Sequence, residues 1–370
     1  MSHPACKPFN LIQMKFPAYL FVSFFLLLSL SACSTPPFSE KEWRQEVEST
    51  DVNQLYAPHY RDGQYFNPWM DVTKDFSELL RWRFSNSPSY TEEEEAYLPV
   101  VWKDAATKIG DDKHGDFILW IGHNSFLIRT GEQVWLTDPI FSKRALLPAR
   151  HTPPAITAAE INKLFPNVNV IISHSHYDHL DKDSIRELSE NYTYYVPMGL
   201  EKTLRNWQPN AEIVEMDWWQ TRDLSNGVEL HCLPAQHWSL RAFERENTSL
   251  WASFMLVTPD TTIYFAGDSG YFIGYREIAR KYSKIDFALI PTTAYHPRWF
   301  MHKAHMNIEE AVRAFQDLGA AYFIPTQWGT FHLGDEPPGY PGLDLKRTIE
   351  KKKLEKERYL ILGIGEIHRL

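Results

Sequence analysis

Cysteine is scarce in this chain of 370 residues: it holds three, and only Cys232 lies beyond residue 33. One cysteine cannot close an intramolecular disulfide, which excludes a disulfide-stapled scaffold for the body of the protein. Cys232 lies in the strand-like run 228–234, so we expect a small buried side chain rather than a nucleophile. Hydrophobic residues make up 44% of the chain, which is ample for a packed core without cross-links.

Positive charge is also in deficit, because 38 Lys and Arg face 47 Asp and Glu and the formal net charge is -9. Proteins that bind nucleic acid need a basic surface to neutralise phosphates, so we do not expect nucleic acid as a partner. The chain has neither an internal repeat nor a low-complexity tract. Its length allows one large domain or two smaller ones.

The N-terminal segment has no acidic residue and includes the apolar stretch 17–30, PAYLFVSFFLLLSL. This stretch is short for a membrane span, and its position indicates a targeting signal instead. It ends in the tetrapeptide LSAC, which resembles the lipobox of bacterial lipoproteins. The resemblance implies a signal peptide over residues 1–32, cleavage before Cys33 and a lipid on the sulfur of that cysteine.

A lipid on Cys33 would anchor the protein to a membrane of the bacterial cell envelope. Ser34 follows the cysteine, and by analogy with Gram-negative lipoproteins this favours the periplasmic face of the outer membrane. An uncleaved anchor and an ordinary secretory signal are the alternatives. Either Met1 or Met14 would serve as the start of such a signal.

The rest of the chain falls into three stretches. Residues 33–56 are polar and mixed in charge, which predicts a tether. Residues 57–115 are aromatic but irregular, and we expect them to be an N-terminal extension of a single domain that spans 57–370. From residue 116 onward, strand-like and helix-like segments alternate.

The order of these segments predicts the fold class. Early strands follow one another and later strands alternate with helices, which favours a four-layer α/β (αββα) sandwich of two sheets with helices outside. The expected strands are 116–121, 125–129, 133–137, 168–173, 193–196, 228–234, 252–258, 262–266, 286–290, 322–325 and 359–363. The expected helices are 181–190, 199–206, 274–282, 307–317 and 343–356.

The stretch SHSHYDHLD at residues 173–181 holds a dense set of potential metal ligands. It follows a β-branched apolar run, and side chains two apart on a strand share a face, so His174 and His176 can point at one spot. Asp178 and His179 follow where the chain turns. Imidazole and carboxylate suit zinc or a similar divalent ion, and two pairs of ligands suggest two adjacent metal positions.

Two further candidates also follow strand-like runs. His237 lies in the sequence LPAQHW, and Asp268 lies in FAGDSG. The small residues around Asp268 allow another segment of backbone to approach closely. A carboxylate in such a place can bridge two metal ions.

Together these residues carry a resemblance to the metallo-β-lactamase superfamily, and within it to the N-acylphosphatidylethanolamine-hydrolysing phospholipases D. The similarity runs from about Phe66 to the C-terminus. The shared motifs beyond SHSHYDHLD are FNPW at 66–69, LLRW at 79–82, LTDPIFS at 136–142, AQHW at 235–238, FAGDSGY at 265–271, AYHPRWFM at 294–301, HMNIEEAV at 305–312 and QWGTF at 327–331.

The resemblance implies a set of ligands for one or two Zn²⁺ ions. His174, His176 and His237 would bind the first metal, Asp178 and His179 the second, and Asp268 would bridge the two. The family's remaining ligand is a His directly before Trp-Gly-Thr-Phe, and this chain has Gln327 there.

Gln327 puts the second metal in doubt, because a neutral amide oxygen is a weaker zinc ligand than an imidazole nitrogen. The second ion would then be loosely held, replaced by a harder ion or absent. His332 and His305 are the candidates for a compensating ligand.

Three residues near the motifs have open roles. Asp138 either orients an imidazole beside the metals or belongs to a structural turn. For His123, in the sequence GHNS, we favour a hydrogen-bonded structural role. His305 precedes a predicted helix, and the resemblance implies that it contacts the substrate phosphate or donates a proton. We therefore expect Asp178, Asp268 and His305 to take part in catalysis.

The resemblance implies a phospholipase D-type phosphodiesterase that cleaves N-acylphosphatidylethanolamine-like phospholipids, because a coordinated divalent ion makes hydroxide available near neutral pH. One alternative is a metallo-hydrolase of another ester, lactone or amide, since this fold supports many chemistries. The other is a metal-binding envelope lipoprotein without enzymatic activity, which only Gln327 favours.

Overall fold

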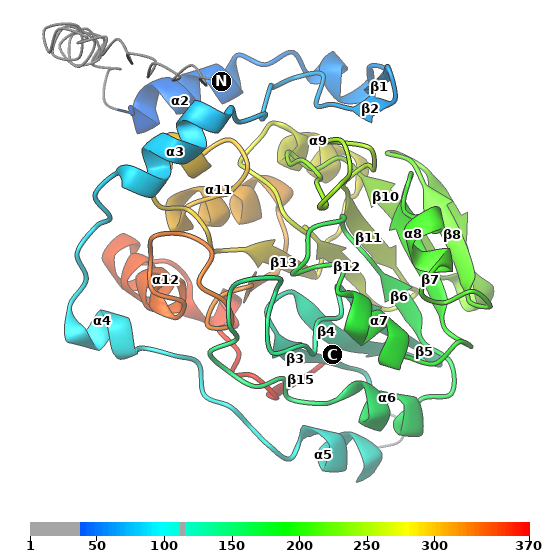
Figure 1. The fold of residues 1–370 in the computed structure, drawn as a ribbon. Coiled ribbons are helices and arrows are strands. Elements are labelled where there is room, and N and C mark those ends of the chain that lie inside the picture. The colour runs from blue at the N-terminus through cyan, green and yellow to red at the C-terminus, as the bar shows by residue number, and fades with distance from the viewer. Residues whose placement is uncertain (1–37, 112–114) are drawn as a thin grey trace, which may run out of the picture. The chain divides into compact units, whose positions relative to one another are not determined.

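Two β-sheets lie at the centre of the computed structural model, which describes residues 38–111 and 115–370 (Figure 1). The predicted signal peptide over residues 1–32 and the predicted lipid site at Cys33 fall outside the described residues. Residues 40–370 form one compact unit, and the elements below belong to it. No helix in the described part of the chain is long and apolar enough to cross a membrane.

The first sheet has the strand order β15-β3-β4-β5-β6-β7-β8. Its early strands pair antiparallel through short turns, whereas β5 to β8 run parallel and need longer crossovers. The strands are β3 (Phe117–Gly122), β4 (Ser125–Thr130), β5 (Gln133–Thr137), β6 (Asn169–Ile171), β7 (Thr193–Pro197), β8 (Glu212–Met216) and β15 (Ile367–Arg369).

The second sheet has the order β14-β13-β12-β11-β10-β9, with β12, β13 and β14 parallel and the others antiparallel. Its strands are β9 (Thr221–Asp223), β10 (Glu229–Leu233), β11 (Ser253–Val257), β12 (Thr262–Phe265), β13 (Phe287–Pro291) and β14 (Tyr322–Thr326). Cys232 is fully buried in β10, which confirms the expected packing role.

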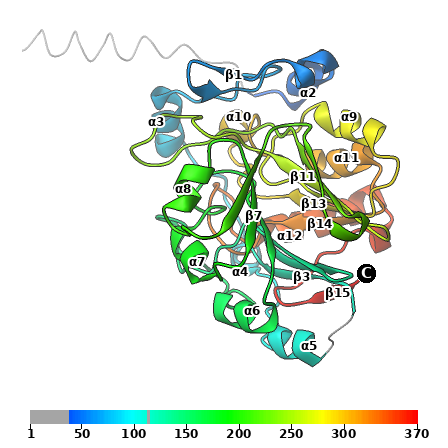
Figure 2. The same cartoon turned by 90° about the vertical axis from the view of Figure 1, so that its right-hand side faces the viewer.

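Helices cover the outer face of each sheet, as the two views show (Figures 1 and 2). On the first sheet, side chains such as Ile161 and Leu204 pack with alternate residues of β3, β5 and β6 in one buried apolar cluster. These helices are α5 (Ala105–Asp111), α6 (Ala158–Leu164), α7 (Lys182–Glu187) and α8 (Glu201–Arg205). The arrangement confirms the predicted four-layer αββα sandwich.

On the second sheet, α11 (Ile308–Leu318) contacts β13 and packs against two other helices, α9 (Gly274–Lys281) and α12 (Tyr340–Lys352). The sequence sets both ends of α11: Asn307 and Glu310 form a capping box, and Gly319 ends the helix at a φ of 64°. The helices on this side are α9 (Gly274–Lys281), α10 (Arg298–Met301), α11 (Ile308–Leu318) and α12 (Tyr340–Lys352).

Residues 40–56 belong to the folded unit, so the predicted tether over 33–56 is wrong from residue 40 onward. Trp43 is buried and its indole donates a hydrogen bond to Glu310 at 2.7 Å, and Leu55 is also buried. Two apolar anchors spaced along a polar stretch are enough to dock it. The elements before β3 are α2 (Glu40–Glu48), η1 (Val52–Tyr56), β1 (Tyr60–Arg61), β2 (Gln64–Tyr65), α3 (Phe76–Phe84) and α4 (Glu92–Ala96).

The C-terminal end of the chain also differs from expectation. Residues 359–363, predicted as a strand, form only a single bridge between Tyr359 and Phe323, and the C-terminal strand is β15 instead. An apolar run that docks beside a sheet without joining its ladder has the same composition as a strand. The remaining short elements are η2 (Ser225–Gly227) and η3 (Lys356–Arg358).

Candidate metal centre

The candidate ligands come from loops that leave one edge of the two sheets. The loop after β6 carries the SHSHYDHLD stretch, the loop after β10 carries His237, and the loop after β12 carries Asp268. Gln327 follows β14, and Asp138 follows β5. The carboxyl ends of parallel strands meet at one edge, which is where α/β proteins build their sites.

The first group of ligand atoms comes from His174, His176, His237 and Asp268, which lie within 4.8 Å of one another. His176 Nδ1 is 2.8 Å from His174 Nε2 and 3.2 Å from His237 Nε2. Asp268 Oδ2 lies 3.8 Å from His174 Nε2 and 3.4 Å from His237 Nε2. Bonds of about 2.0–2.1 Å to a tetrahedral zinc ion would separate its ligand atoms by about 3.3 Å, so this spacing fits one ion.

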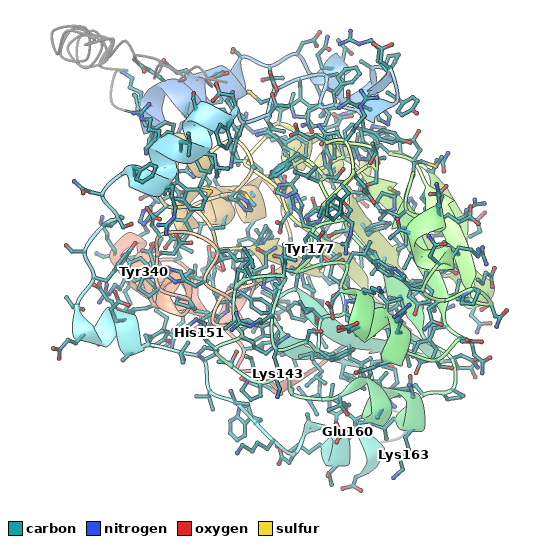
Figure 3. All side chains as sticks on the ribbon, viewed as in Figure 1. Lys143, His151, Glu160, Lys163, Tyr177 and Tyr340 are labelled. Carbon is teal, nitrogen blue, oxygen red and sulfur yellow. The ribbon has the colours of Figure 1, made fainter. Side chains whose placement is uncertain are left out.

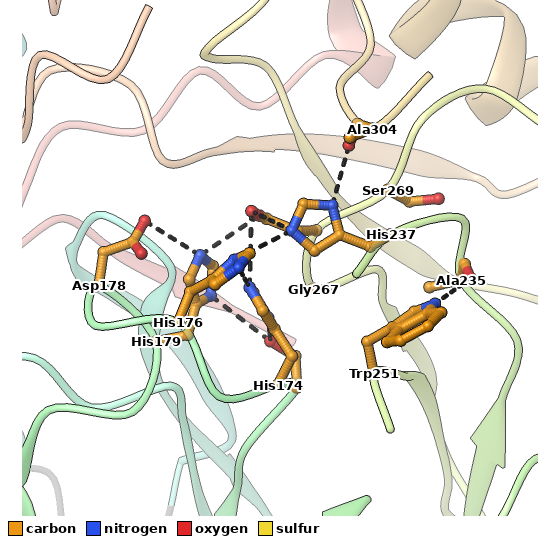
Figure 4. Close-up of polar contacts among 12 residues, drawn as sticks. His174, His176, Asp178, His179, Ala235, His237, Trp251, Gly267, Ser269 and Ala304 are labelled. Carbon is orange, nitrogen blue, oxygen red and sulfur yellow. Dashed lines mark hydrogen bonds and ion pairs between the residues drawn. The ribbon is translucent and has the colours of Figure 1, made fainter. Parts of the chain in front are cut away.

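The outer ring nitrogens of His174 and His237 are already engaged, whereas His176 Nε2 is buried without a hydrogen-bond partner among the described residues. His237 Nδ1 lies 3.1 Å from the carbonyl oxygen of Ala304 (Figure 4), and His174 Nδ1 lies 2.9 Å from the hydroxyl of Ser173. The rings of His174 and His237 therefore have their protons on the outer nitrogen and their lone pairs on the nitrogen that faces the group. Lone pairs that face one another without protons between them need a cation.

The second group comes from Asp178 and His179, together with His123 from the turn between β3 and β4. Asp178 Oδ2 is 3.2 Å from His179 Nε2 and 3.0 Å from His123 Nε2. His179 Nε2 is also 3.3 Å from Asp268 Oδ1, so Asp268 turns one oxygen to each group. This is the geometry that a bridging carboxylate requires.

Asp138 holds His179 in place. Its Oδ2 lies 2.7 Å from His179 Nδ1, and the same carboxylate accepts hydrogen bonds from Asn124 and from the backbone and hydroxyl of Ser173. His179 Nε2, on the other side of the ring, is buried with no hydrogen-bond partner among the described residues. Two roles were expected for Asp138 from sequence, and the structure supports the one in which it orients an imidazole.

The electrostatics of the cluster call for positive charge. Burial alone would lower the pKa of His179, but the carboxylates of Asp268, Asp178 and Asp138 raise it well above the usual value. Burial opposes ionisation of Asp268, yet the neighbouring His179 and His237 hold the pKa of that carboxyl well below its usual range. Ionised carboxylates buried around one spot are stable only with a cation between them.

The histidines of the first group have the opposite shift. Burial, reinforced by the neighbouring imidazoles, lowers the pKa of His174 well below the usual value, and burial lowers the pKa of His176 to about 4. Such rings are neutral at pH 7, which is the form that binds a metal. The donor set and its charge thus fit divalent metal ions.

The remaining predicted residues lie around this cluster. The side-chain amide of Gln327 contacts Asp268 Oδ1 directly. His305 packs its ring 5.2 Å from that of His237, and burial lowers the pKa of His305 to about 4. His332 is exposed and belongs to neither group, so it does not compensate for Gln327.

A cavity of about 570 Å³ opens beside both ligand groups. Its floor includes the candidate ligands His176, Asp178 and Asp268, and His305 lines it as well. The walls are largely apolar and aromatic, and include Tyr177, which is labelled in Figure 3. The apolar and aromatic wall residues from elsewhere in the chain are Phe76, Leu79, Trp82, Ala145, Leu146, Leu147, Pro148, Trp238, Leu240, Ala294, Phe300, Met301 and Leu333. Two acidic side chains, Asp75 and Glu246, also line the cavity.

Lys74 is the one lysine or arginine among the described residues that line this cavity. Its Nζ lies 4.0 Å from the centre of the Phe300 ring and 3.9 Å from Met301 Sδ. It forms no ion pair within the described part of the chain, and burial lowers its pKa to about 8. The group stays charged at pH 7, and sequence reasoning missed it because it lies in the irregular N-terminal extension.

The N-terminal extension also supports the His237 loop. The side-chain amide of Asn67 donates a hydrogen bond to the carbonyl of His237 at 2.9 Å, and the indole of Trp69 donates to Gln236 at 3.0 Å. Further along, Trp82 stacks on Phe300 with 4.8 Å between ring centres. These contacts explain why the FNPW and LLRW motifs accompany the ligand motifs.

Comparisons with known proteins agree with this geometry. A family model described as "Beta-lactamase superfamily domain" matches residues 134–328, which is more than half of the chain. The chain belongs to the metallo-β-lactamase superfamily. It is a metallo-hydrolase of that superfamily, and its His and Asp groups are the residues that would hold the metal.

Relatives and structural neighbours support the assignment. An uncharacterized protein of Mycobacterium tuberculosis is 35% identical over 305 residues, 77% of this chain and 78% of the relative. N-acyl-phosphatidylethanolamine-hydrolyzing phospholipase D 1 of Caenorhabditis elegans is 29% identical over 366 residues, 92% of this chain and 98% of the relative. A metallo hydrolase from Ignicoccus hospitalis has the same fold, with a TM-score of 0.54 at 19% identity over 69% of this chain and 98% of that one.

Proposed function

We propose that this protein is a zinc-dependent phosphodiesterase of the phospholipase D type, acting on N-acylphosphatidylethanolamine-like phospholipids. The observation that carries the proposal is the cavity beside the ligand groups. It combines apolar walls, which suit acyl chains, with one ammonium group, Lys74, which suits a phosphate. The similarity to the Caenorhabditis elegans phospholipase supports the same substrate class.

In the proposed reaction a water oxygen forms a bond to phosphorus, and the bond between phosphorus and the headgroup oxygen breaks. The products are phosphatidic acid and the headgroup alcohol, which takes up a proton. Bound zinc supplies a water acidic enough to act as hydroxide near neutral pH. The site histidines and aspartates would hold that metal, with Asp178 and Asp268 on the side that faces the cavity.

Lys74 and His305 would contact the substrate itself. The Lys74 ammonium would bind the negative charge that the phosphodiester oxygens already carry in the bound substrate. His305 Nδ1 is buried without a hydrogen-bond partner among the described residues, so its ring is free to bond to the phosphate or to the leaving oxygen. Apolar walls would exclude bulk water around the reacting group.

The test is a substrate panel. Full-length protein in detergent, fully loaded with Zn²⁺, is incubated with diacyl and N-acyl phospholipids and with small soluble esters, lactones and amides. Release of phosphatidic acid from a phospholipid is the expected result. Turnover of a soluble substrate with no phosphatidic acid from any lipid would replace this proposal by that of another metallo-hydrolase.

We also propose that the protein is anchored through a lipid on Cys33 at the periplasmic face of the outer membrane. The LSAC tetrapeptide and Ser34 support this location, and a lipid substrate is concentrated at such a surface. The test is metabolic labelling with a radioactive fatty acid, followed by membrane fractionation. Label that remains on the Cys33→Ala variant would refute the anchor.

A further inference from the structure

The structure offers a replacement for the histidine that is missing at position 327. We infer that His123 is a ligand of the second metal ion, together with Asp178, His179 and Asp268. His123 lies in the turn between β3 and β4, about 200 residues away in sequence from the place where the family's motif puts this ligand. The hydrogen-bonded role favoured from sequence is present in the structure, and metal binding would be a second role of the same residue.

The backbone of His123 is held tightly at this turn. The residue has a φ of 52° and is fully buried. Its N–H donates a hydrogen bond to Thr330 Oγ1 at 2.8 Å, and its carbonyl accepts from the Gln327 N–H at 2.9 Å and from the Trp120 indole at 2.9 Å. A residue in the left-handed region persists when its surroundings over-determine it, and such positions cluster at functional sites.

The imidazole of His123 is oriented as a ligand would be. Its Nδ1 lies 3.3 Å from the carbonyl oxygen of Gln327, so the ring proton belongs on Nδ1. His237 has the same arrangement with Ala304 in the first group. His123 Nε2 then carries a lone pair and points at Asp178 Oδ2, 3.0 Å away. With this tautomer, a cation between or beside the two acceptors would satisfy both of them.

His123, Asp178 and His179 offer ligand atoms within 4.8 Å of one another, and Asp268 joins them through its contact with His179. The three separations recorded among His123, Asp178, His179 and Asp268 are 3.0, 3.2 and 3.3 Å. Tetrahedral zinc with ordinary bond lengths separates its ligand atoms by about 3.3 Å. The set is two imidazoles and two carboxylates, so it needs no contribution from Gln327.

Gln327 has a different role in this arrangement. Its side-chain nitrogen contacts Asp268 Oδ1 and lies 3.4 Å from the carbonyl of Gly267, which is the environment of a hydrogen-bond donor. Its backbone carbonyl orients His123. Gln327 is therefore a positioning residue on both sides: its side chain steadies the bridging carboxylate and its main chain steadies the new ligand.

The test measures metal content and needs no substrate. Full-length protein is stripped with a chelator, reloaded with Zn²⁺ and freed of unbound ions, and metal per chain is measured by mass spectrometry. We expect about two ions in the wild type, in Gln327→Ala and in the control His332→Ala, and about one in His123→Ala. His332 is a suitable control because it is exposed and close in sequence to Gln327.

A double variant guards against misfolding. In His123→Ala/Gln327→His the family's usual ligand is restored, and we expect the second ion to return. Two ions in His123→Ala together with one in Gln327→Ala would overturn the inference, as would a wild type that binds only one. If His123→Ala binds no metal at all, the double variant decides: two ions support the inference and none refutes it. A failure of lipid turnover leaves this measurement unaffected.

Discussion

The floor and the rim of the cavity differ in polarity and in exposure to solvent. The metal floor, formed by the ligands of the two groups, is polar and largely buried: His174, His179 and His237 are at most 1% exposed. The apolar rim, formed by Phe76, Leu79, Leu146, Leu147 and Leu240, is exposed: Phe76 is 73% and Leu147 75% accessible. Polar groups are hidden and apolar groups are displayed, which is the reverse of an ordinary soluble surface.

This difference indicates that the floor determines the reaction, whereas the rim determines which substrate is bound. Each floor residue is fixed by two or more partners, so a change there removes a ligand or misdirects one. Rim residues have few partners and gain contacts only when an apolar molecule covers them. We therefore expect substitutions on the floor to abolish turnover, and substitutions on the rim to change which physical form of lipid is attacked.

Removal of a floor ligand has the largest expected effect. His174→Ala deletes one of the imidazoles of the first group, and loss of the metal's contribution of several kcal/mol corresponds to a decrease in kcat/KM of about 10³-fold or more. Metal analysis and turnover are measured on the same sample, with the exposed His151→Ala as control. Undiminished turnover in a variant that has lost metal would show that the floor is not the reaction centre.

Asp138→Asn tests the carboxylate that orients the His179 imidazole of the floor. The amide cannot accept a hydrogen bond from His179 Nδ1 as strongly, so the imidazole loses its orientation, and we expect metal affinity or activity to fall about 10–100-fold. Chelator competition measures the affinity, and Asp183→Asn, an exposed acid nearby, is the control. A purely structural turn would lower the melting temperature and leave the affinity unchanged.

Lys74 lines the same cavity as the floor and the rim. In Lys74→Met the ammonium is lost but the apolar contacts are kept, so we expect KM for an anionic phospholipid to rise about tenfold with little change in kcat. Lys74→Arg should retain most of the affinity, and the exposed Lys143→Met should behave as wild type. A fall in kcat alone would contradict a role in substrate binding.

The same residue predicts a dependence on pH. Burial lowers the pKa of Lys74 to about 8, so the ammonium loses its proton as the pH rises through 8 and KM should increase above that value. Glu78 raises the pKa of Lys74, and the acidic residues Asp75, Asp178, Glu246 and Asp268 line the same cavity. The rings of His176 and His305 are not protonated at pH 8, because burial lowers the pKa of each to about 4. The arginine variant should lack the increase, and a rise that persists in it would come from another group.

The smallest expected effect belongs to the rim. Phe76→Ser combined with Leu147→Ser removes two exposed apolar side chains, whose partial burial in a lipid surface is worth about 1 kcal/mol. We expect about fivefold slower turnover of phospholipid vesicles. Turnover of a short-chain monomeric phospholipid should be unchanged, and an equal loss on both substrates would refute a surface role.

Much of the fold was predictable because it depends on local patterns. The run before residue 173 forms β6 as its β-branched residues predict, and the segment 307–317 forms α11 between its caps. Predictions were wrong where composition does not specify the partner. Residues 359–363 have strand composition but dock beside the sheet, and residues 40–56 have the composition of a tether but are held by Trp43 and Leu55.

By itself, the sequence determined the candidate ligands that share a motif: His174, His176, Asp178 and His179 lie within six positions, and a strand followed by a turn brings them together. His237 and Asp268 were found because they follow strand-like runs, and the family resemblance then implied their roles as ligands. Only the tertiary structure decided which residues from distant segments lie beside these candidate ligands. His123 and Lys74 reach the site from distant segments. The spacing of residues in the sequence could not predict their positions, because these positions depend on how two sheets and an N-terminal extension pack.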